Sequence, residues 1–303
     1  MQYIFRFKDS ISIILLYSLL VKSDEIANFV KPTTLPKYFA VDVDGTFFVH
    51  DPTTFKKNID AFKLLKEKNI TPFFCTGTDR PSNKNLLGDS FFNETGYDGT
   101  PGIYANGALV YGNNGTLVKM EKFSEAFLEK FKDHMTNNGL NSRTIYTTED
   151  KLFVIEKIAD DVLNYLKLIK YIEPTQITFD ELKTKNVVTI VFNSDNFQME
   201  GATENTDYTI TYPNKGVAQI TPPGCNKKSA LKALLDHLKS NAHECAYIGD
   251  GVNDIPGFEL CDLSFAVGNA KDEVKQKAKW VLDLNYDQGA FEKVVKLLVE
   301  DQQ

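Results

Sequence analysis

The chain has 303 residues, about twice the size of a common domain, which predicts two domains or one domain with a large insertion. Apolar residues make up 42% and charged residues 25%, a globular composition that excludes a disordered or fibrous protein. The formal net charge of −7 without basic clusters argues against a nucleic-acid partner, and the 4 cysteines form no pattern typical of a disulfide framework or a zinc site.

Residues 1–37 are expected to form an N-terminal extension. Within them, residues 11–21 are an apolar run that is far too short to span a membrane as a helix. Basic residues precede this run and Ser23 follows it, an arrangement typical of a secretory signal. An amphipathic helix packed against the protein explains the same run, and both interpretations stay open. The protein is therefore expected in the secretory pathway if residues 1–23 are cleaved, and in the cytoplasm otherwise.

Beyond the extension, buried strands alternate with amphipathic helices in the first and last parts of the chain. Continuous apolar runs predict strands, and apolar residues at i, i+3, i+4 and i+7 predict helices. The expected strands are residues 38–43, 70–75, 246–248, 264–267 and 280–282. The expected helices are those around Ile59 to Leu65, Leu231 to Leu238 and Phe291 to Leu298. This alternation predicts a parallel sheet covered by helices.

The middle of the chain predicts a second, smaller α/β unit. Helical periodicity occurs at residues 127–135 and 162–169, and strand-like runs occur at residues 152–156, 187–192 and 208–211. Because these elements interrupt the strands of the parallel sheet, we expect an inserted domain at residues 113–214. The flanking segments, residues 38–112 and 215–303, are expected to form the core domain.

Two clusters of acidic and amide side chains follow buried strands. Asp42 and Asp44 come directly after the first strand and, because side chains alternate, leave it on the same side. Asp250, Asn253 and Asp254 crowd a glycine turn after a later strand. The carboxyl ends of parallel strands meet at one edge of a sheet, where ligands bind. Carboxylates brought together there repel one another unless a divalent cation lies between them, which predicts a metal site.

Two further motifs supply groups that bind anions. Thr76 and Gly77 follow the strand at residues 70–75 and offer a hydroxyl group and backbone N–H groups. Lys227 opens a predicted helix, where its charge opposes the helix dipole and therefore needs a partner or a function. Each motif alone is weak, since a common turn or a solvated lysine explains it. Together with the acidic clusters, they complete the groups that phosphoryl transfer requires.

These four motifs, in this order, resemble those of the haloacid dehalogenase superfamily, in particular its Cof-type phosphatases with a large α/β cap. The resemblance runs from residue 38 to residue 298 and includes two segments outside the catalytic set, Asn106-Gly107-Ala108 and Val267-Gly268-Asn269-Ala270. It implies an α/β fold with a Rossmann-like core, a parallel sheet and an inserted α/β cap domain.

The resemblance also implies a role for each motif residue. Asp42 would attack phosphorus, Asp44 would act as acid and base, and Lys227 would complete the catalytic set. The groups that would bind the transferring phosphoryl group are those of Thr76, Gly77, Lys227 and Asn253. The groups implied at a Mg²⁺ ion are those of Asp42, Asp44 (through its backbone carbonyl), Asp250 and Asp254, the last supporting either the metal or Lys227.

Two positions depart from the family pattern. Thr78 stands where the family usually has arginine, and Arg80 comes two places later, so the role of the family arginine stays unassigned in this chain. Lys228 stands where the family usually has glycine after its lysine, which leaves open whether Lys227 or Lys228 enters the site. Neither departure affects the nucleophile or the acidic residues.

The sequence thus predicts Mg²⁺-dependent hydrolysis of a small phosphomonoester, a sugar phosphate or similar, through an aspartyl-phosphate. A phosphomutase of the same superfamily would share every catalytic residue, and a non-catalytic sugar-phosphate-binding protein is an alternative from another class. A P-type ion pump carries a similar Gly-Asp-Gly-x-Asn-Asp segment but needs several membrane spans, which this sequence does not encode. The expected partner is a small phosphorylated metabolite, and the substrate and oligomeric state stay open.

Overall fold

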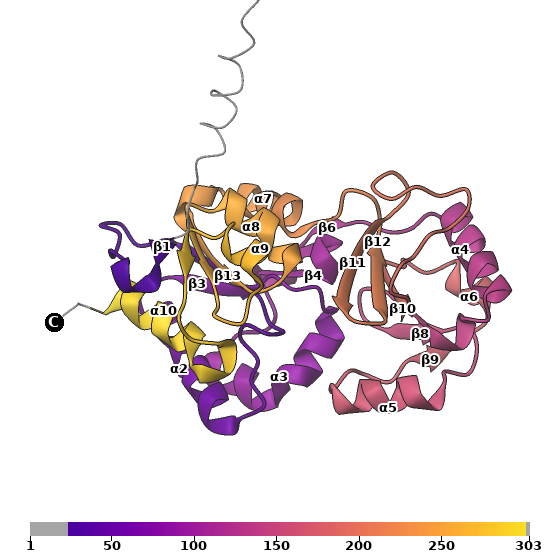
Figure 1. Ribbon diagram of the computed structural model, residues 1–303, viewed down its shortest axis with the longest axis horizontal. Helices are drawn as coiled ribbons and strands as arrows, with labels where there is room; N and C mark the ends of the chain where they lie inside the picture. Colours follow the sequence, from indigo (N-terminus) through magenta and orange to yellow (C-terminus); the bar gives the residue numbers. More distant parts are fainter. Residues whose placement is uncertain (1–23, 301–303) are drawn as a thin grey trace, which may run out of the picture.

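The structure, a computed structural model, describes residues 24–300. Figure 1 shows two α/β units side by side, one built from both ends of the described chain and the other from its middle. The apolar run at residues 11–21, and with it the choice between a signal and a helix, lies outside the described residues. Among residues 24–300, no helix is long and apolar enough to cross a membrane.

A six-stranded parallel sheet forms the first unit. Its strand order is β1-β15-β14-β13-β2-β3, so β13 from the late part of the chain pairs directly with β2 from the early part. The strands are β1 (Asp24–Glu25), β2 (Tyr38–Val41), β3 (Thr71–Phe74), β13 (Cys245–Gly249), β14 (Leu263–Ala266) and β15 (Trp280–Val281). All five strands predicted for this sheet are present. The edge strand β1 adds a part of the expected extension to the sheet.

Helices cover both faces of this sheet. On one face pack α2 (Pro52–Glu67), α3 (Arg80–Thr95) and α10 (Ala290–Val299), and on the other pack α7 (Lys227–His237), α8 (Ile255–Leu260) and α9 (Asp272–Lys275). Alternate residues of β2 belong to the two cores, with Phe39 on the first face and Ala40 on the second. The predicted helices correspond to α2, α7 and α10, and the predicted parallel sheet covered by helices is confirmed.

A three-stranded antiparallel sheet, for which no strand was predicted, extends the core. It contains β4 (Gly102–Tyr104), β5 (Leu109–Tyr111) and β6 (Leu117–Met120). A single bridge between Cys75 and Ile103 joins it to the end of β3. Ile103 and Val110 pack in the same buried cluster as the leucines of α7. The small sheet therefore supports the side of the core where β3 ends.

The second unit is a six-stranded mixed sheet in the order β11-β12-β10-β7-β8-β9. Its strands are β7 (Thr144–Thr147), β8 (Leu152–Val154), β9 (Thr175–Gln176), β10 (Thr189–Asn193), β11 (Thr209–Asn214) and β12 (Val217–Thr221). Its helices are α4 (Glu125–Asn137), α5 (Asp160–Leu168) and α6 (Phe179–Leu182). The predicted helices and strands of the middle segment are present as α4, α5, β8, β10 and β11. The helices α4 and α6 bury one face of the sheet, and α5 covers part of the other.

We propose that the inserted domain covers residues 121–221 and that the core domain begins at residue 24. The strand β6 pairs with β5 of the small core sheet, whereas β12 pairs with β10 and β11 of the second unit. In this proposal, both ends of the insert lie later in the chain than the expected 113–214. Apolar runs in a sequence indicate where strands occur but not which strands pair with one another. The proposed boundaries differ from the expected ones because they follow the observed strand pairing.

Candidate active site

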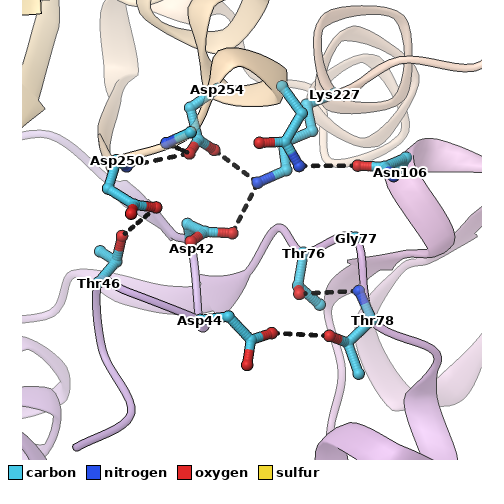
Figure 2. Close-up of polar contacts among 12 residues, drawn as sticks. Asp42, Asp44, Thr46, Thr76, Gly77, Thr78, Asn106, Lys227, Asp250 and Asp254 are labelled. Carbon is cyan, nitrogen blue, oxygen red and sulfur yellow. Dashed lines mark hydrogen bonds and ion pairs between the residues drawn. The ribbon is translucent and has the colours of Figure 1, made fainter. Parts of the chain in front are cut away.

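The predicted site residues lie at the carboxyl end of the parallel sheet. Asp42 and Asp44 follow β2, Thr76 and Gly77 follow β3, and Lys227 is the first residue of α7. Asp250 follows β13, and Asn253 and Asp254 lie in the 3₁₀ turn Val252–Asp254 that comes next. Figure 2 shows Asp42, Lys227, Asp250 and Asp254 pointing toward one another, with Asp44 turned toward Thr78. The four motifs thus come together from four separate parts of the sequence.

Lys227 forms the centre of the acidic cluster. Its side chain is fully buried, and its Nζ atom donates hydrogen bonds to Asp42 Oδ1 at 2.6 Å and to Asp254 Oδ1 at 2.5 Å. Burial disfavours its ammonium ion, but Asp254 and Asp42 more than offset this effect and raise the pKa of Lys227 above its ordinary value. Burial, and next the charge of Asp254, raises the pKa of Asp42 well above its ordinary value. The cluster therefore holds one cation and an excess of acidic groups.

The local sequence explains why Lys227 enters the site. Asn226 caps α7 by accepting the Ser229 N–H at 2.9 Å, so the helix begins at Lys227. The two carboxylates supply the partner that a cation at a helix start requires. Lys228, in contrast, is about half exposed and lies 3.8 Å from Glu259 on α8. The structure therefore puts Lys227, and not Lys228, into the cluster.

Asp254 uses both of its carboxylate oxygens within the protein. Its Oδ1 atom accepts hydrogen bonds from Lys227 at 2.5 Å and from the Tyr247 hydroxyl at 2.7 Å. Its Oδ2 atom accepts the backbone N–H groups of Asp250 at 3.1 Å and Gly251 at 2.9 Å. Because every contact fixes an adjacent part of the site, Asp254 orients both Lys227 and the turn that carries Asp250.

Asp250 lies close to the turn that follows Asp44. A Cβ atom on Gly45, whose φ is +76°, would lie 2.4 Å from the Asp250 Oδ2 atom, so only glycine fits there. The amide of Asn269 donates to Asp250 Oδ2 at 3.2 Å and to the Gly45 carbonyl at 3.0 Å. Burial, and next the charge of Asp254, raises the pKa of Asp250 to about 7. Oxygen atoms of Asp42, Asp250 and Asp254 lie within 4.8 Å of one another, close enough to contact a single cation.

Asp44 points away from this cluster and remains accessible to solvent. Its Oδ2 atom accepts a hydrogen bond from the Thr78 hydroxyl at 2.8 Å. Protein atoms crowd around its carboxyl group enough that desolvation raises its pKa, although the Thr78 bond acts in the opposite direction. Asp44 is therefore a carboxyl group that protein atoms surround while solvent, or a ligand, can still reach it.

Amide side chains connect the Thr76–Thr78 turn to the inserted domain. Asn253 donates to Asn106 at 2.9 Å, Asn106 donates to Gln219 at 3.0 Å, and Gln219 donates to the Gly77 carbonyl at 2.8 Å. The Thr76 hydroxyl oxygen accepts the Thr78 N–H at 3.0 Å. Gln219 lies on β12, so this network joins the predicted phosphate-binding turn, Asn253 and the second sheet.

Arg80 lies outside the cluster. Its guanidinium group lies 4.8 Å from the centre of the Tyr111 ring, and it donates to the Asp98 carbonyl at 3.5 Å. These contacts hold it against the small sheet that contains β5. Arg80 therefore has no contact with the acidic residues among the described contacts, whereas Thr78 bonds to Asp44.

Several residues that contact the site were not among the predicted site residues, among them Asn106, Tyr171, Gln219 and Asn269. Asn106 and Asn269 lie in segments that resemble the family outside its catalytic set. That resemblance was the available signal for these two residues. Tyr171 and Gln219 belong to the inserted domain, and no motif distinguishes them from other polar residues there.

Comparison with known proteins identifies the class of this chain. Residues 39–294 match the family described as haloacid dehalogenase-like hydrolase, and the chain belongs to that family. The chain is 25% identical over 260 residues to the 5-amino-6-(5-phospho-D-ribitylamino)uracil phosphatase YcsE of Bacillus subtilis, covering 84% of this chain and 92% of that protein. A solved HAD/COF-like hydrolase from Plasmodium vivax has the same fold, with a TM-score of 0.75, 24% identity and coverage of 86% and 95%. The predicted family and fold class are confirmed, and the family description confirms that the predicted enzyme is a hydrolase.

A further relative matches over part of its length. The chain is 24% identical over 280 residues to the chloroplastic endoribonuclease YBEY of Arabidopsis thaliana. The match covers 83% of this chain, but the chain spans only 44% of the length of that plant protein.

Replacing Lys227 with methionine should destabilise the metal-free protein by about 3–5 kcal/mol, because Asp42 and Asp254 would then be buried without their cation. The matched variant Lys228→Met should change the free energy of unfolding by less than about 0.5 kcal/mol, since its ammonium group is exposed. Urea unfolding in the presence of a chelator measures both values. Equal effects of the two substitutions would contradict the assigned register.

Proposed function

We propose that this protein hydrolyses a small phosphomonoester with Mg²⁺ as cofactor, by transferring the phosphoryl group to Asp42 and then to water. The observation that carries the proposal is the contact between Asp42 and Lys227 at 2.6 Å, beside Asp250 and the Thr76 turn. A carboxylate nucleophile next to a fixed cation and further acidic groups is the arrangement that phosphoryl transfer through a covalent intermediate requires.

The donor set fits Mg²⁺. Asp42 and Asp250 offer carboxylate oxygens close to one another, and hard oxygen ligands are those that Mg²⁺ prefers. Asp44 would contribute its backbone carbonyl, while Asp254 supports Lys227 with both oxygens already engaged. When bound, the ion supplies positive charge that stabilises the phosphoryl oxygens and orients them.

Asp42 acts as the nucleophile in this proposal. The Lys227 ammonium group fixes one of its oxygens and neutralises charge on the transferring group. The Thr76 hydroxyl and the N–H groups of the turn around Gly77 bind the phosphoryl oxygens, and the Asn253 amide adds a further donor. The amide network through Asn106 keeps Asn253 and that turn in register.

Asp44 acts as the acid and then as the base. Desolvation raises its pKa, so it holds a proton at a higher pH than an ordinary aspartate does. It donates this proton to the leaving oxygen when Asp42 attacks phosphorus. The resulting carboxylate then accepts a proton from the water that attacks the aspartyl-phosphate.

The substrate class is a small phosphorylated metabolite with a polar leaving group. YcsE, a relative over most of both chains, is named for a phosphorylated ribitylaminouracil. Gln219 and Thr211 of the second sheet point to the same side, because the two are register partners on β12 and β11. Both contact Asn106, at 3.0 and 3.4 Å, so polar groups of the insert lie next to the site. Neutral hydrogen-bonding side chains suit a hydroxylated group such as a sugar.

Phosphate release from p-nitrophenyl phosphate tests the proposal. Hydrolysis should stop with a chelator and return with Mg²⁺, and Asp42→Asn should lose turnover because an amide cannot attack phosphorus. The matched control Asp89→Asn, on the exposed face of α3, should retain it. Full activity after exhaustive chelation would refute the metal requirement. Conversion of a sugar phosphate to an isomer without phosphate release would support a phosphomutase, and binding without turnover would support a non-catalytic protein.

The affinity for Mg²⁺ should rise with pH. In the metal-free protein the pKa of Asp250 is raised to about 7, so below that pH the group holds a proton that must leave before the ion binds. Between about pH 6 and about pH 8 the ionised fraction, and with it the affinity, should increase about tenfold. Isothermal titration calorimetry measures this change, with Asp89→Asn as a control that should show the same slope. An affinity independent of pH over this range would contradict the prediction.

A further inference from the structure

We propose that Thr78 and Tyr171 are positioning residues for Asp44. Through them, contact between the inserted domain and the core orients the Asp44 carboxyl group to protonate the leaving group. The inference rests on the proposed function and adds two residues to it. It also gives a role to Thr78, which departs from the arginine of the family pattern.

The three side chains form a continuous chain of hydrogen bonds. Thr78 Oγ1 donates to Asp44 Oδ2 at 2.8 Å and lies 3.0 Å from the hydroxyl oxygen of Tyr171. The Thr78 side chain is buried, at 5% exposure, so water does not compete freely for its hydroxyl group. Asp44 and Thr78 come from the core, after β2 and β3, whereas Tyr171 comes from the inserted domain, just after α5.

With Oδ2 of Asp44 as the acceptor from Thr78, the number of hydrogen atoms gives the direction of this chain. The hydroxyl group of Thr78 has one hydrogen, which it gives to the carboxyl group of Asp44. Tyr171 must therefore donate to Thr78, because the Thr78 oxygen has only lone pairs left to offer. Oδ2 of Asp44 is thereby kept as an acceptor. Oδ1 remains as the oxygen that can hold the proton for the leaving group.

The end of α5 holds Tyr171 in a defined place. Lys170 has a φ of +57°, and the Tyr171 N–H bonds to the Leu166 carbonyl at 2.9 Å while the Lys170 N–H bonds to the Lys167 carbonyl at 3.2 Å. These features form a Schellman motif, in which glycine is usual at the position of Lys170. A rigid helix end with a non-glycine residue in the left-handed region fixes where the next side chain starts.

The same segment touches the core at two further points. Asn85 of α3 donates to the Lys170 carbonyl at 2.7 Å, and the Lys170 ammonium group lies 5.6 Å from the centre of the Phe48 ring. Residues 170–171 are therefore a contact point between the two units. Separation of the units at this point would withdraw the Tyr171 hydroxyl from Thr78, so the hydrogen bond to Asp44 would lose its support.

Loss of a residue that positions the acid should slow hydrolysis most for substrates whose leaving group needs a proton. Phenyl phosphate and p-nitrophenyl phosphate are similar in shape, but phenolate is the more basic leaving group and depends more on protonation. The ratio kcat/KM covers the steps up to departure of the leaving group, so hydrolysis of the aspartyl-phosphate does not enter the comparison.

The experiment compares Thr78→Val, Thr78→Ser and Tyr171→Phe with the wild-type protein on these two esters. Thr78→Val removes the hydroxyl group and should lower kcat/KM for phenyl phosphate at least about tenfold more than for p-nitrophenyl phosphate. Thr78→Ser keeps the hydroxyl group and should keep the wild-type ratio between the two substrates. Tyr171→Phe should shift the ratio in the same direction as Thr78→Val but less, since Thr78 can still donate to Asp44.

Tyr165→Phe, on α5 itself, is the matched control. Tyr165 is 42% exposed and its hydroxyl group accepts a hydrogen bond from the Asn214 amide at 3.4 Å rather than bonding to Thr78, so this variant should behave like the wild type. Equal losses on both esters, a Thr78→Ser variant as impaired as Thr78→Val, or identical behaviour of Tyr171→Phe and Tyr165→Phe would overturn the inference alone. Failure of the wild-type protein to hydrolyse either ester would overturn the proposed function, and the inference with it.

Discussion

The buried ammonium group of Lys227 is the interaction on which the site depends. It bonds to Asp42 and Asp254 with no exposure to solvent, and Asp250 lies beside them. Removing one partner of such a buried ion-paired group lowers the free energy of unfolding by more than the intact group adds to it, because the remaining charges stay buried. One cation among several acidic groups leaves an excess of negative charge. In the proposed function, this excess favours a further cation, which in turn would allow an anionic phosphoryl group to approach.

The topology brings these groups together without long loops. The strands β2 and β13 are neighbours in the parallel sheet, so Asp42 and Asp250 emerge side by side at its carboxyl end. The helix α7 begins after the last strand of the inserted domain and carries Lys227 in its first turn. In the sequence, the insert thus lies between the motif that holds Thr76 and the motif that holds Lys227, after α3 and the small core sheet. Through Gln219 and Tyr171 it also contacts both Gly77 and Thr78.

The sequence predicted those site residues that stand in recognisable local patterns. Asp42, Lys227 and Asp250 were found because each follows a buried strand or opens a helix, and their proximity follows from the fold. The strand β12 and the residues Tyr171 and Gln219 were missed, because their role arises from pairing and contact between distant segments. Whether Lys227 or Lys228 enters the site was also decided by the fold, since the Asn226 cap sets the start of α7.

Trapping of the covalent intermediate tests the central claim, that Asp42 is the nucleophile and Asp44 the acid and base, most directly. Asp44→Asn keeps the nucleophile but loses the base that activates water, a loss worth about 100- to 10,000-fold. After reaction with p-nitrophenyl phosphate and rapid quenching, intact-mass analysis should detect one added phosphoryl group on Asp44→Asn and none on Asp42→Asn. A phosphorylated Asp42→Asn protein, or normal turnover by Asp44→Asn, would contradict the account.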